Sequence, residues 1–230
     1  MIIAVHQPLL LPWPGLFFKA LKADVLVFLD DVQFPTGSSF LTRNRIKDED
    51  GPLWLIVPVW RKGLGLQQIR DVEICYQRKW RRKHLTAIRQ NYTNAPYLDK
   101  YMPELKETYR RDHTLLADLN LEIILFLAGA LHIDTPFLLQ TELGVKSAGT
   151  DLIIDICREA GADGFLNFPA AAGHLDTEAM RKEGIEFIPA RYRPPVYPQL
   201  HGEFIYNLST LDLLMNCGPA GRDIILEAGG

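Results

Sequence analysis

Polar side chains stand directly after the first apolar segment of the chain. Residues 2–5 are apolar and predict a buried strand, and His6 and Gln7 follow it. A neutral imidazole at a strand end can act as a general base or polarise a phosphate or carbonyl, so His6 is the first candidate catalytic residue. Gly15 opens the next predicted helix, whose free N–H groups favour an anion. Gln7, Trp13 and Lys19 are candidate substrate-binding residues of this segment. The plainer alternative is a histidine satisfied by a backbone carbonyl.

Two adjacent acids follow the next predicted strand, residues 25–29. Asp30 and Asp31 are further candidate catalytic residues, which can hold Mg²⁺, accept sugar hydroxyls or orient His6. Gln33 is a candidate substrate-binding residue beside them. One of the acids serves equally well as the cap of a turn. The His and Cys spacing of a zinc site is absent, so the sequence predicts no metal site.

A basic pair precedes the strand that begins at Trp54. Arg43 and Arg45 can bind phosphate or carboxylate in bidentate fashion, and Asn44 between them is a candidate ligand as well. The alternative is a surface loop whose arginines pair with the acidic run 48–50.

A late polar segment adds three hydrogen-bonding candidates for substrate binding, Tyr197, Gln199 and Asn207. Ser209 and Asp212 fit a capping box at the start of a helix, which explains both residues structurally. A Ser209–His6–Asp triad stays open as an alternative, although no GxSxG sequence supports it.

The elements that must position these residues indicate an α/β fold. A strand, loop, helix and strand within residues 2–29 form a βαβ unit, which favours a mainly parallel sheet flanked by helices. Residues 54–59 predict a third strand and residues 71–74 an edge strand. A helical insertion is expected around residues 77–131, after which strands and helices alternate again. With no repeat or Gly/Ser linker, residues 1–230 are expected to form a single domain.

Composition narrows the partners. The net charge of −3 and the 47% hydrophobic content fit a globular protein and predict neither a nucleic-acid partner nor membrane insertion. The basic run 78–84 lies on one amphipathic helix and is interpreted as a solvated face, with polyanion contact as the alternative. Three scattered cysteines and the absence of a signal peptide predict a cytoplasmic protein. Composition names no cofactor and no oligomeric state.

Together these segments resemble the WbqC-like family, in one collinear order over nearly the whole length. The matching residues are His6-Gln7-Pro8, Pro12-Trp13, Gly15, Lys19, 24–34, Arg43-Asn44-Arg45-Ile46, Gly51, Trp54-Leu55, Val57-Pro58-Val59, Trp80, Tyr92, Ala95-Pro96-Tyr97, Tyr197-Pro198-Gln199, Phe204, Asn207-Leu208-Ser209, 211–214 and Asn216-Cys217-Gly218. The resemblance implies a cytoplasmic bacterial protein of O-antigen or other surface-polysaccharide biosynthesis. It implies work on an activated sugar, with transfer as the reaction, and it carries over no catalytic residue. Residues 166–174 depart from the family pattern, which more often has a Gly-containing turn and a Tyr.

The first βαβ unit is also similar in outline to nucleotidyltransferases of the HxGH type. Pantothenate synthetase-like enzymes follow their second strand with a Gln-Phe dipeptide, as Gln33-Phe34 does here. The second His and its Gly partner are missing, and Lys146-Ser147 is a poor counterpart of the Lys-Ser loop in that family.

Three hypotheses follow. The first is a group transferase acting on a nucleotide-activated sugar or similar phosphate-bearing small molecule, with His6 as general base. The second is a nucleotidyl- or adenylyltransferase that uses ATP and Mg²⁺. The third is a non-catalytic accessory protein that binds a biosynthetic enzyme or intermediate. The first requires that His6, the pair Asp30-Asp31 and the pair Arg43-Arg45 meet in one cleft.

Overall fold

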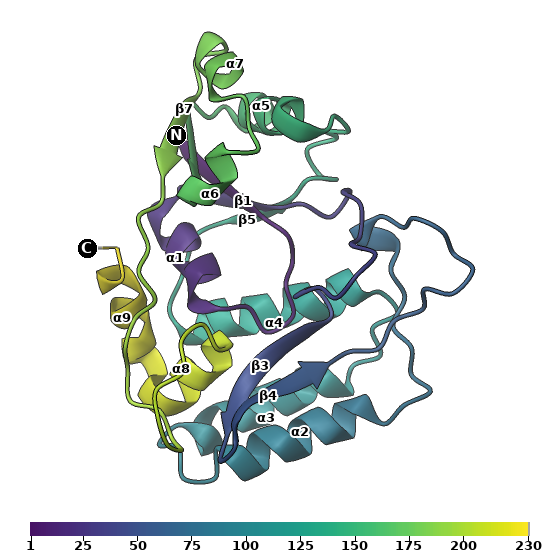
Figure 1. Ribbon diagram of the computed structural model, residues 1–230, viewed down its shortest axis with the longest axis vertical. Helices are drawn as coiled ribbons and strands as arrows, with labels where there is room; N and C mark the ends of the chain where they lie inside the picture. Colours follow the sequence, from purple (N-terminus) through teal and green to yellow (C-terminus); the bar gives the residue numbers. More distant parts are fainter. Residues whose placement is uncertain (230) are drawn as a thin grey trace.

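A five-stranded parallel sheet organises the upper half of the protein (Figure 1). The computed structural model describes residues 1–229. The strands are β1 (Ile2–His6), β2 (Val25–Phe28), β5 (Phe137–Leu139), β6 (Gly164–Asn167) and β7 (Glu186–Pro189). Their order is β5-β2-β1-β6-β7, and every neighbouring pair is parallel. The expected α/β fold with a mainly parallel sheet is therefore confirmed.

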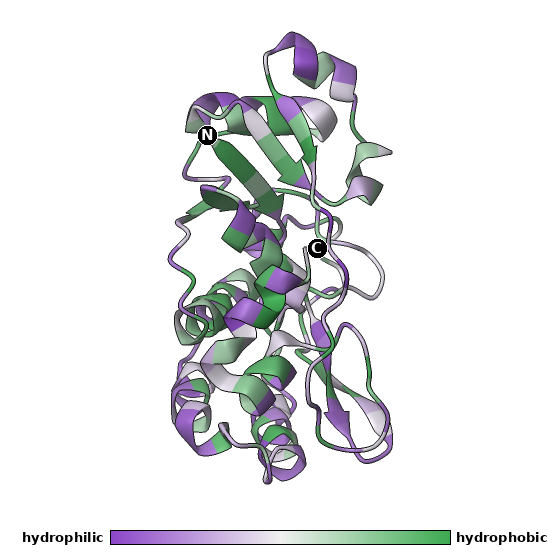
Figure 2. Cartoon of the chain, turned by 90° about the vertical axis from the view of Figure 1, so that its left-hand side faces the viewer, coloured by the Kyte–Doolittle hydropathy of each residue, from purple (hydrophilic) through white to green (hydrophobic). Residues whose placement is uncertain are grey.

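Both faces of this sheet are covered, which explains why its strands are nearly continuous apolar runs (green in Figure 2). Side chains alternate along a strand, so Ile3 and Val5 share one face, and Ala4 lies on the other. The first face packs on α5 (Gly149–Ala160) and α7 (Thr177–Lys182). The second face packs on α1 (Pro14–Lys22), the helix that joins β1 to β2. A short helix, α6 (Pro169–Ala172), follows β6.

Three helices of the lower half occupy the predicted insertion at residues 77–131. They are α2 (Trp80–Asn91), α3 (Leu98–Arg110) and α4 (Leu116–Ala130). Most residues of α4 are buried, because its apolar side chains cover nearly the whole circumference. The same hydrophobic core includes residues of α3, α4 and the lower face of the sheet. Among residues 1–229 no helix is long and apolar enough to cross a membrane.

The strand expected at residues 54–59 belongs to a different sheet. The segment forms β4 (Gly51–Ile56), which pairs antiparallel with β3 (Arg43–Asp48) in a separate hairpin. A two-residue turn after Asp48 reverses the chain, with Gly51 at φ +124°, and this makes the pairing antiparallel. The edge strand expected at 71–74 is reduced to isolated bridges and a 3₁₀ turn, η1 (Ile69–Asp71).

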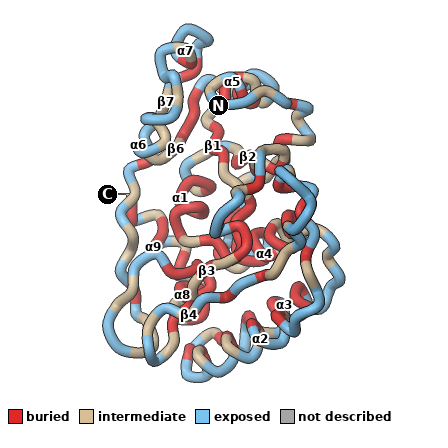
Figure 3. The backbone as a smooth tube through the Cα atoms, turned by 45° about the vertical axis from the view of Figure 1, so that its right-hand side comes forward, coloured by how far each residue is buried: buried red, intermediate tan, exposed pale blue. Residues whose placement is uncertain are grey.

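The end of the chain packs against both halves. A strap of residues 190–209 runs from β7 down one side of the protein to α8 (Thr210–Cys217), which is followed by η2 (Gly218–Ala220) and α9 (Gly221–Glu227). Ser209 caps α8 by accepting a hydrogen bond from the backbone N–H of Leu211. The prediction that Asp212 completes a capping box with Ser209 is wrong, because the Asp212 carboxylate accepts hydrogen bonds from the hydroxyls of Tyr92 and Tyr197 instead. Figure 3 shows α8 and α1 largely buried and α7 largely exposed.

Candidate functional site

The strand order places a topological switch point between β1 and β6. The chain continues from β1 to β2 on one side and returns later to β6 on the other. Loops diverge from the carboxyl ends of such a strand pair, and ligands of open α/β sheets bind in the crevice between them. His6 ends β1 and Asn167 ends β6. The candidate site is therefore built around these two strand ends.

Lys19 points from α1 to these strand ends. Its Nζ donates to the backbone oxygen of Val5 at 2.5 Å and to Oδ1 of Asn167 at 3.2 Å, and lies 5.2 Å from the ring centre of Phe168. The side chain is 2% exposed, and none of residues 1–229 provides a carboxylate within ion-pair distance. Burial lowers the pKa of Lys19 to about 7. An amine that gains and loses its proton near neutrality thus lies at the switch point.

His6 is half-buried beside this lysine. Its Nδ1 lies 2.9 Å from the backbone oxygen of Gln7, which can only accept, so Nδ1 carries the proton and Nε2 keeps its lone pair. Within the described chain Nε2 has no hydrogen-bond partner and is not enclosed. Burial, then the charge of Lys19, lowers the pKa of His6 to about 3. The imidazole is neutral at pH 7 and serves as an acceptor, while its low basicity makes it a weak general base.

An aromatic wall adjoins Lys19. Trp13 lies 5.3 Å from both Phe168 and Tyr192, measured between ring centres. A Cβ atom at Gly15 would come within 2.2 Å of the Trp13 ring, so glycine is required where the indole crosses the start of α1. The wall borders a cavity of about 550 Å³. The polar residues lining this cavity are Arg191, Arg193 and Asn207. Neither His6 nor Lys19 is part of the cavity lining, but Lys19 contacts the ring of Phe168, which is part of it.

The two acids after β2 each bind a residue other than His6. Asp30 is buried and accepts from the backbone N–H of Thr141 at 3.1 Å and from its hydroxyl at 2.6 Å. Asp31 forms an ion pair with Arg70 at 3.1 Å. The Gln7 carbonyl holds the His6 ring, and neither aspartate is hydrogen-bonded to it. The catalytic roles of Asp30 and Asp31 stay predictions.

The hairpin residues divide between the two faces of β3. Asn44 is buried, and its amide donates to the backbone oxygens of Leu10 and Leu11 at 3.2 and 2.8 Å. Arg43 and Arg45 stack on Trp54, with guanidinium-to-ring distances of 4.4 and 5.5 Å. Arg45 also donates to the backbone oxygen of Asn207 at 3.3 Å, which joins the hairpin to the rim of the cavity. Substrate binding by these residues and by exposed Gln33 stays a prediction.

Tyr197 and Gln199 belong to a separate buried network. Tyr92 and Tyr197 donate their hydroxyls to the carboxylate of Asp212 at 2.6 and 2.9 Å. Lys47, also buried, donates to Oε1 of Gln199 at 3.3 Å and to the backbone oxygen of residue 203 at 2.6 Å. Burial raises the pKa of Asp212, and these hydroxyl donors oppose that change. The network ties β3, α2 and α8 to the strap.

Five residues of the site were missed from the sequence: Asn167, Phe168, Arg191, Tyr192 and Arg193. Asn167 and Phe168 follow an apolar run that was recognised as a strand, so the strand-end argument used for His6 could have found them. Tyr192 stands in the Pro-rich strap, where no local pattern marks it. No hydrogen bond or ion pair within residues 1–229 joins His6 to Asp30 or Asp31, and the expected meeting of the three polar clusters stays a prediction.

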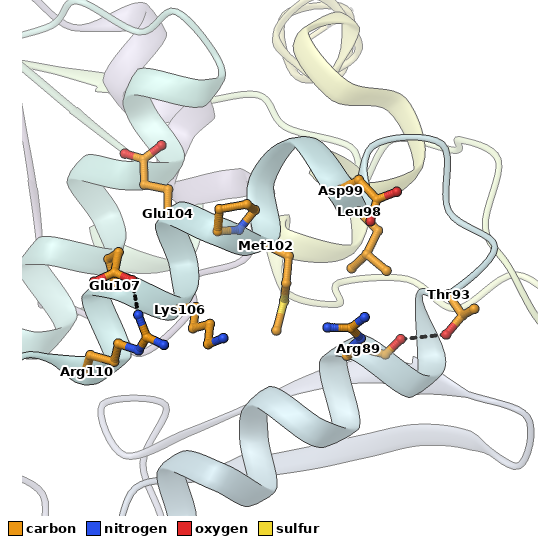
Figure 4. A pocket seen from close by; sticks show the side chains of 10 residues that line it. Arg89, Thr93, Leu98, Asp99, Met102, Glu104, Lys106, Glu107 and Arg110 are labelled. Carbon is orange, nitrogen blue, oxygen red and sulfur yellow. Dashed lines mark hydrogen bonds and ion pairs between the residues drawn. The ribbon is translucent and has the colours of Figure 1, made fainter.

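Another hollow, of about 650 Å³, lies between α2 and α3 (Figure 4). Its charged lining contains both signs and includes an ion pair between Glu107 and Arg110 at 2.5 Å. None of the candidate residues lines it, so we do not assign it the chemistry of the switch point.

The fold and the strand-end site define an α/β protein with a polar site at the switch point of a parallel sheet. The WbqC-like protein family model matches residues 7–224, and the chain belongs to this family. It is 30% identical over 227 residues to the uncharacterized protein Rv1507c of Mycobacterium tuberculosis, covering 97% of this chain and 96% of that protein. No solved structure matches the chain.

Proposed function

We propose that the chain is an enzyme that transfers a group to or from a phosphate-bearing small molecule, most simply a nucleotide-activated sugar, at the switch point of its parallel sheet. One observation carries the proposal: Lys19 is buried at the ends of β1 and β6 with no carboxylate partner among the described residues. Burying an unpaired cation is costly, so such a residue is typical of a functional site. A cytoplasmic role in bacterial surface-polysaccharide biosynthesis forms part of the proposal.

Lys19 is assigned the proton transfer and the charge stabilisation. Two of the three ammonium N–H groups bind Val5 and Asn167, which leaves the third for an oxygen of the substrate. With a pKa of about 7, the amine exchanges a proton readily at neutral pH. In its charged form it stabilises negative charge that develops on a phosphate or carbonyl oxygen.

We assign His6 the role of binding and orienting the acceptor substrate. Its free Nε2 accepts a hydrogen bond from a hydroxyl or amine, and the Gln7 carbonyl fixes the ring that presents this nitrogen. This changes the role expected from the sequence, since a pKa of about 3 suits orientation better than proton removal.

In this proposal, the cavity next to Phe168 binds most of the substrate. Trp13, Phe168 and Tyr192 offer aromatic surface to a sugar or base, and the guanidiniums of Arg191 and Arg193 suit phosphate. A volume of about 550 Å³ fits a ligand of metabolite size.

A thermal-shift screen of nucleotide sugars, ATP, acyl donors and divalent ions tests the proposal. A ligand at about a hundred times its dissociation constant should stabilise the protein by about 2.7 kcal/mol. Turnover of the hit is then compared for wild type, Lys19→Met and the control Lys22→Met, an exposed lysine on the same helix. We expect a loss of at least about 10²-fold for Lys19→Met and little change for Lys22→Met.

The outcomes separate the hypotheses. Turnover that survives Lys19→Met and His6→Ala contradicts the proposed site. Magnesium-dependent pyrophosphate release from ATP identifies a nucleotidyltransferase. Binding without turnover across the screen identifies an accessory protein.

A further inference from the structure

A third hollow, lined by cations and tryptophans, lies between β4 and the start of α2. Its volume is about 290 Å³, and no residue assigned to the switch point lines it. Trp54, Ile56 and Pro58 contribute apolar surface from the hairpin side, and Trp80 does so from α2. The hollow is therefore distinct from the site proposed above.

The charge of this hollow has one sign. Arg78 and Lys83 line it, both are exposed, and neither pairs with a carboxylate anywhere in residues 1–229. No acidic residue is part of the lining. His84 is neutral there, because burial lowers its pKa to about 4, and both of its ring nitrogens have partners. An anion entering this hollow meets two unpaired cations and no carboxylate.

A buried hydrogen-bond donor in the same lining has no partner. Trp80 is 4% exposed, and its indole N–H makes no hydrogen bond within the described chain. A buried donor without a partner destabilises the protein, and a hydrogen bond to a ligand oxygen would remove that cost. Trp80 is also the first residue of α2, whose first turn has neither an acidic residue nor a side-chain cap.

The positive charge extends past Trp54 onto the hairpin. Arg43 and Arg45 lie over its ring. The guanidinium of Arg43 makes no hydrogen bond or ion pair within residues 1–229, whereas that of Arg45 donates to the backbone oxygen of Asn207. Trp54 is 38% exposed and Ile56 is 50% exposed, so apolar surface borders the cations. Apolar surface next to unpaired cations matches a ligand with a flat or apolar part and an anionic group.

We propose that the hollow between β4 and α2 binds the phosphate group of a ligand whose apolar part lies against Trp54 and Ile56. Arg78 and Lys83 neutralise the phosphate, and the indole N–H of Trp80, which is enclosed in the unliganded protein, becomes accessible on binding and donates to one of the phosphate oxygens. The small volume favours a single phosphate group with a short apolar neighbour over a polynucleotide. The phosphate belongs to a free metabolite or to a lipid headgroup.

Titration calorimetry at low ionic strength tests this with inorganic phosphate and phenyl phosphate. The double variant Arg78→Gln/Lys83→Gln removes the two lining charges. The matched control, Lys79→Gln/Arg82→Gln, removes two exposed charges from the same segment outside the lining. We expect phenyl phosphate to bind the wild type more tightly than inorganic phosphate does. Its dissociation constant should rise by roughly tenfold or more in the lining variant and stay unchanged in the control variant.

Trp80→Phe removes the N–H and keeps an aromatic ring, and it should weaken the binding of phenyl phosphate several-fold. Vesicles of phosphatidylcholine with and without phosphatidic acid form the second arm. Binding to acidic vesicles alone, lost in the lining variant, supports a lipid headgroup as the source of the phosphate. Equal weakening by both double variants, or no binding of any phosphate probe by the wild type, overturns the proposal.

Discussion

Lys19 is a cation buried without a carboxylate partner among the described residues, so burial opposes the charged form of its amine. An ordinary lysine stays protonated to about pH 10, whereas this one has a pKa of about 7 because water is excluded from it. Two hydrogen bonds hold the amine in place without neutralising it. The folded protein therefore releases a proton from Lys19 at a pH where the unfolded chain keeps it.

The first prediction follows from this difference. Between about pH 7 and 10 the unfolded state binds more protons at Lys19 than the folded state, so the free energy of unfolding rises with pH, by up to about 1.4 kcal/mol per pH unit. Urea titrations from pH 6 to 9 give the free energy of unfolding of wild type and of Lys19→Met, and the difference between these two values should change with pH. A difference that stays constant with pH would contradict the burial of a titrating amine.

His6 provides a second residue-scale prediction. Its pKa of about 3 implies that the ring stays neutral, with the proton on Nδ1, throughout pH 5–8. The ¹⁵N chemical shifts of the imidazole should therefore show one neutral tautomer at pH 5.5, while an ordinary histidine is mostly protonated there. A midpoint near 6.5 would show that the ring is solvated and would return it to the role of general base.

At the scale of elements, polar side chains tie together strands and helices that lie far apart in sequence. Asp30 connects the end of β2 to Thr141 after β5. The Asp212 network connects α8 to Tyr92 at the end of α2 and to Tyr197 in the strap. Both carboxylates are buried, so their loss leaves donors unsatisfied.

A third prediction compares the two acids after β2. Asp30→Ala leaves both Thr141 donors without a partner and should lower the free energy of unfolding by about 1–3 kcal/mol. Asp31→Ala breaks only a partly exposed ion pair with Arg70 and should cost less than about 1 kcal/mol. Urea denaturation of both variants measures the contrast. Equal, small effects would free Asp30 for the catalytic role expected from the sequence.

A fourth prediction concerns the network at Asp212. Tyr92→Phe removes a 2.6 Å hydrogen bond to the carboxylate and should cost about 1.5–3 kcal/mol. The same change made in an Asp212→Asn background should cost less, because the two residues are coupled. A double-mutant cycle gives the coupling energy, and additive effects would show that the hydrogen bond contributes little.

At the scale of the whole molecule, one hydrophobic core joins the sheet to the helical half. Ala4, Leu26 and Phe28 of the strands share it with Leu105 of α3 and Ile123 of α4. A second core lies on the opposite face of the sheet, under α5 and α7. Since β1 and β2 contribute side chains to both cores, separating the two halves would expose apolar surface in each.

The fifth prediction is that residues 1–230 unfold as one unit. Urea transitions followed by tryptophan fluorescence and by far-UV circular dichroism should coincide. Trp54, Trp60 and Trp80 report on the hairpin and its surroundings and Trp13 on the switch point, whereas circular dichroism averages over the chain. Two separate transitions would divide the chain into two domains.

The sequence by itself determined the parallel sheet and the ends of its first strands. Apolar runs at 2–5 and 25–29 can be buried on both faces only in a covered parallel sheet, so His6 and Asp30 had to follow strand ends. Ser209 was predictable as a cap, because capping depends on neighbouring residues alone.

Only the tertiary structure decided which polar residues meet. Lys19, Asn167 and Tyr192 are far apart in sequence and share one site because α1, β6 and the strap converge there. β3 and β4 pair with each other rather than with the main sheet, because strands adjacent along the chain pair at a lower cost in loop-closure entropy than distant strands do. Local patterns specify which groups can do chemistry, whereas long-range packing sets the burial that gives Lys19 its low pKa and Asp212 its high one.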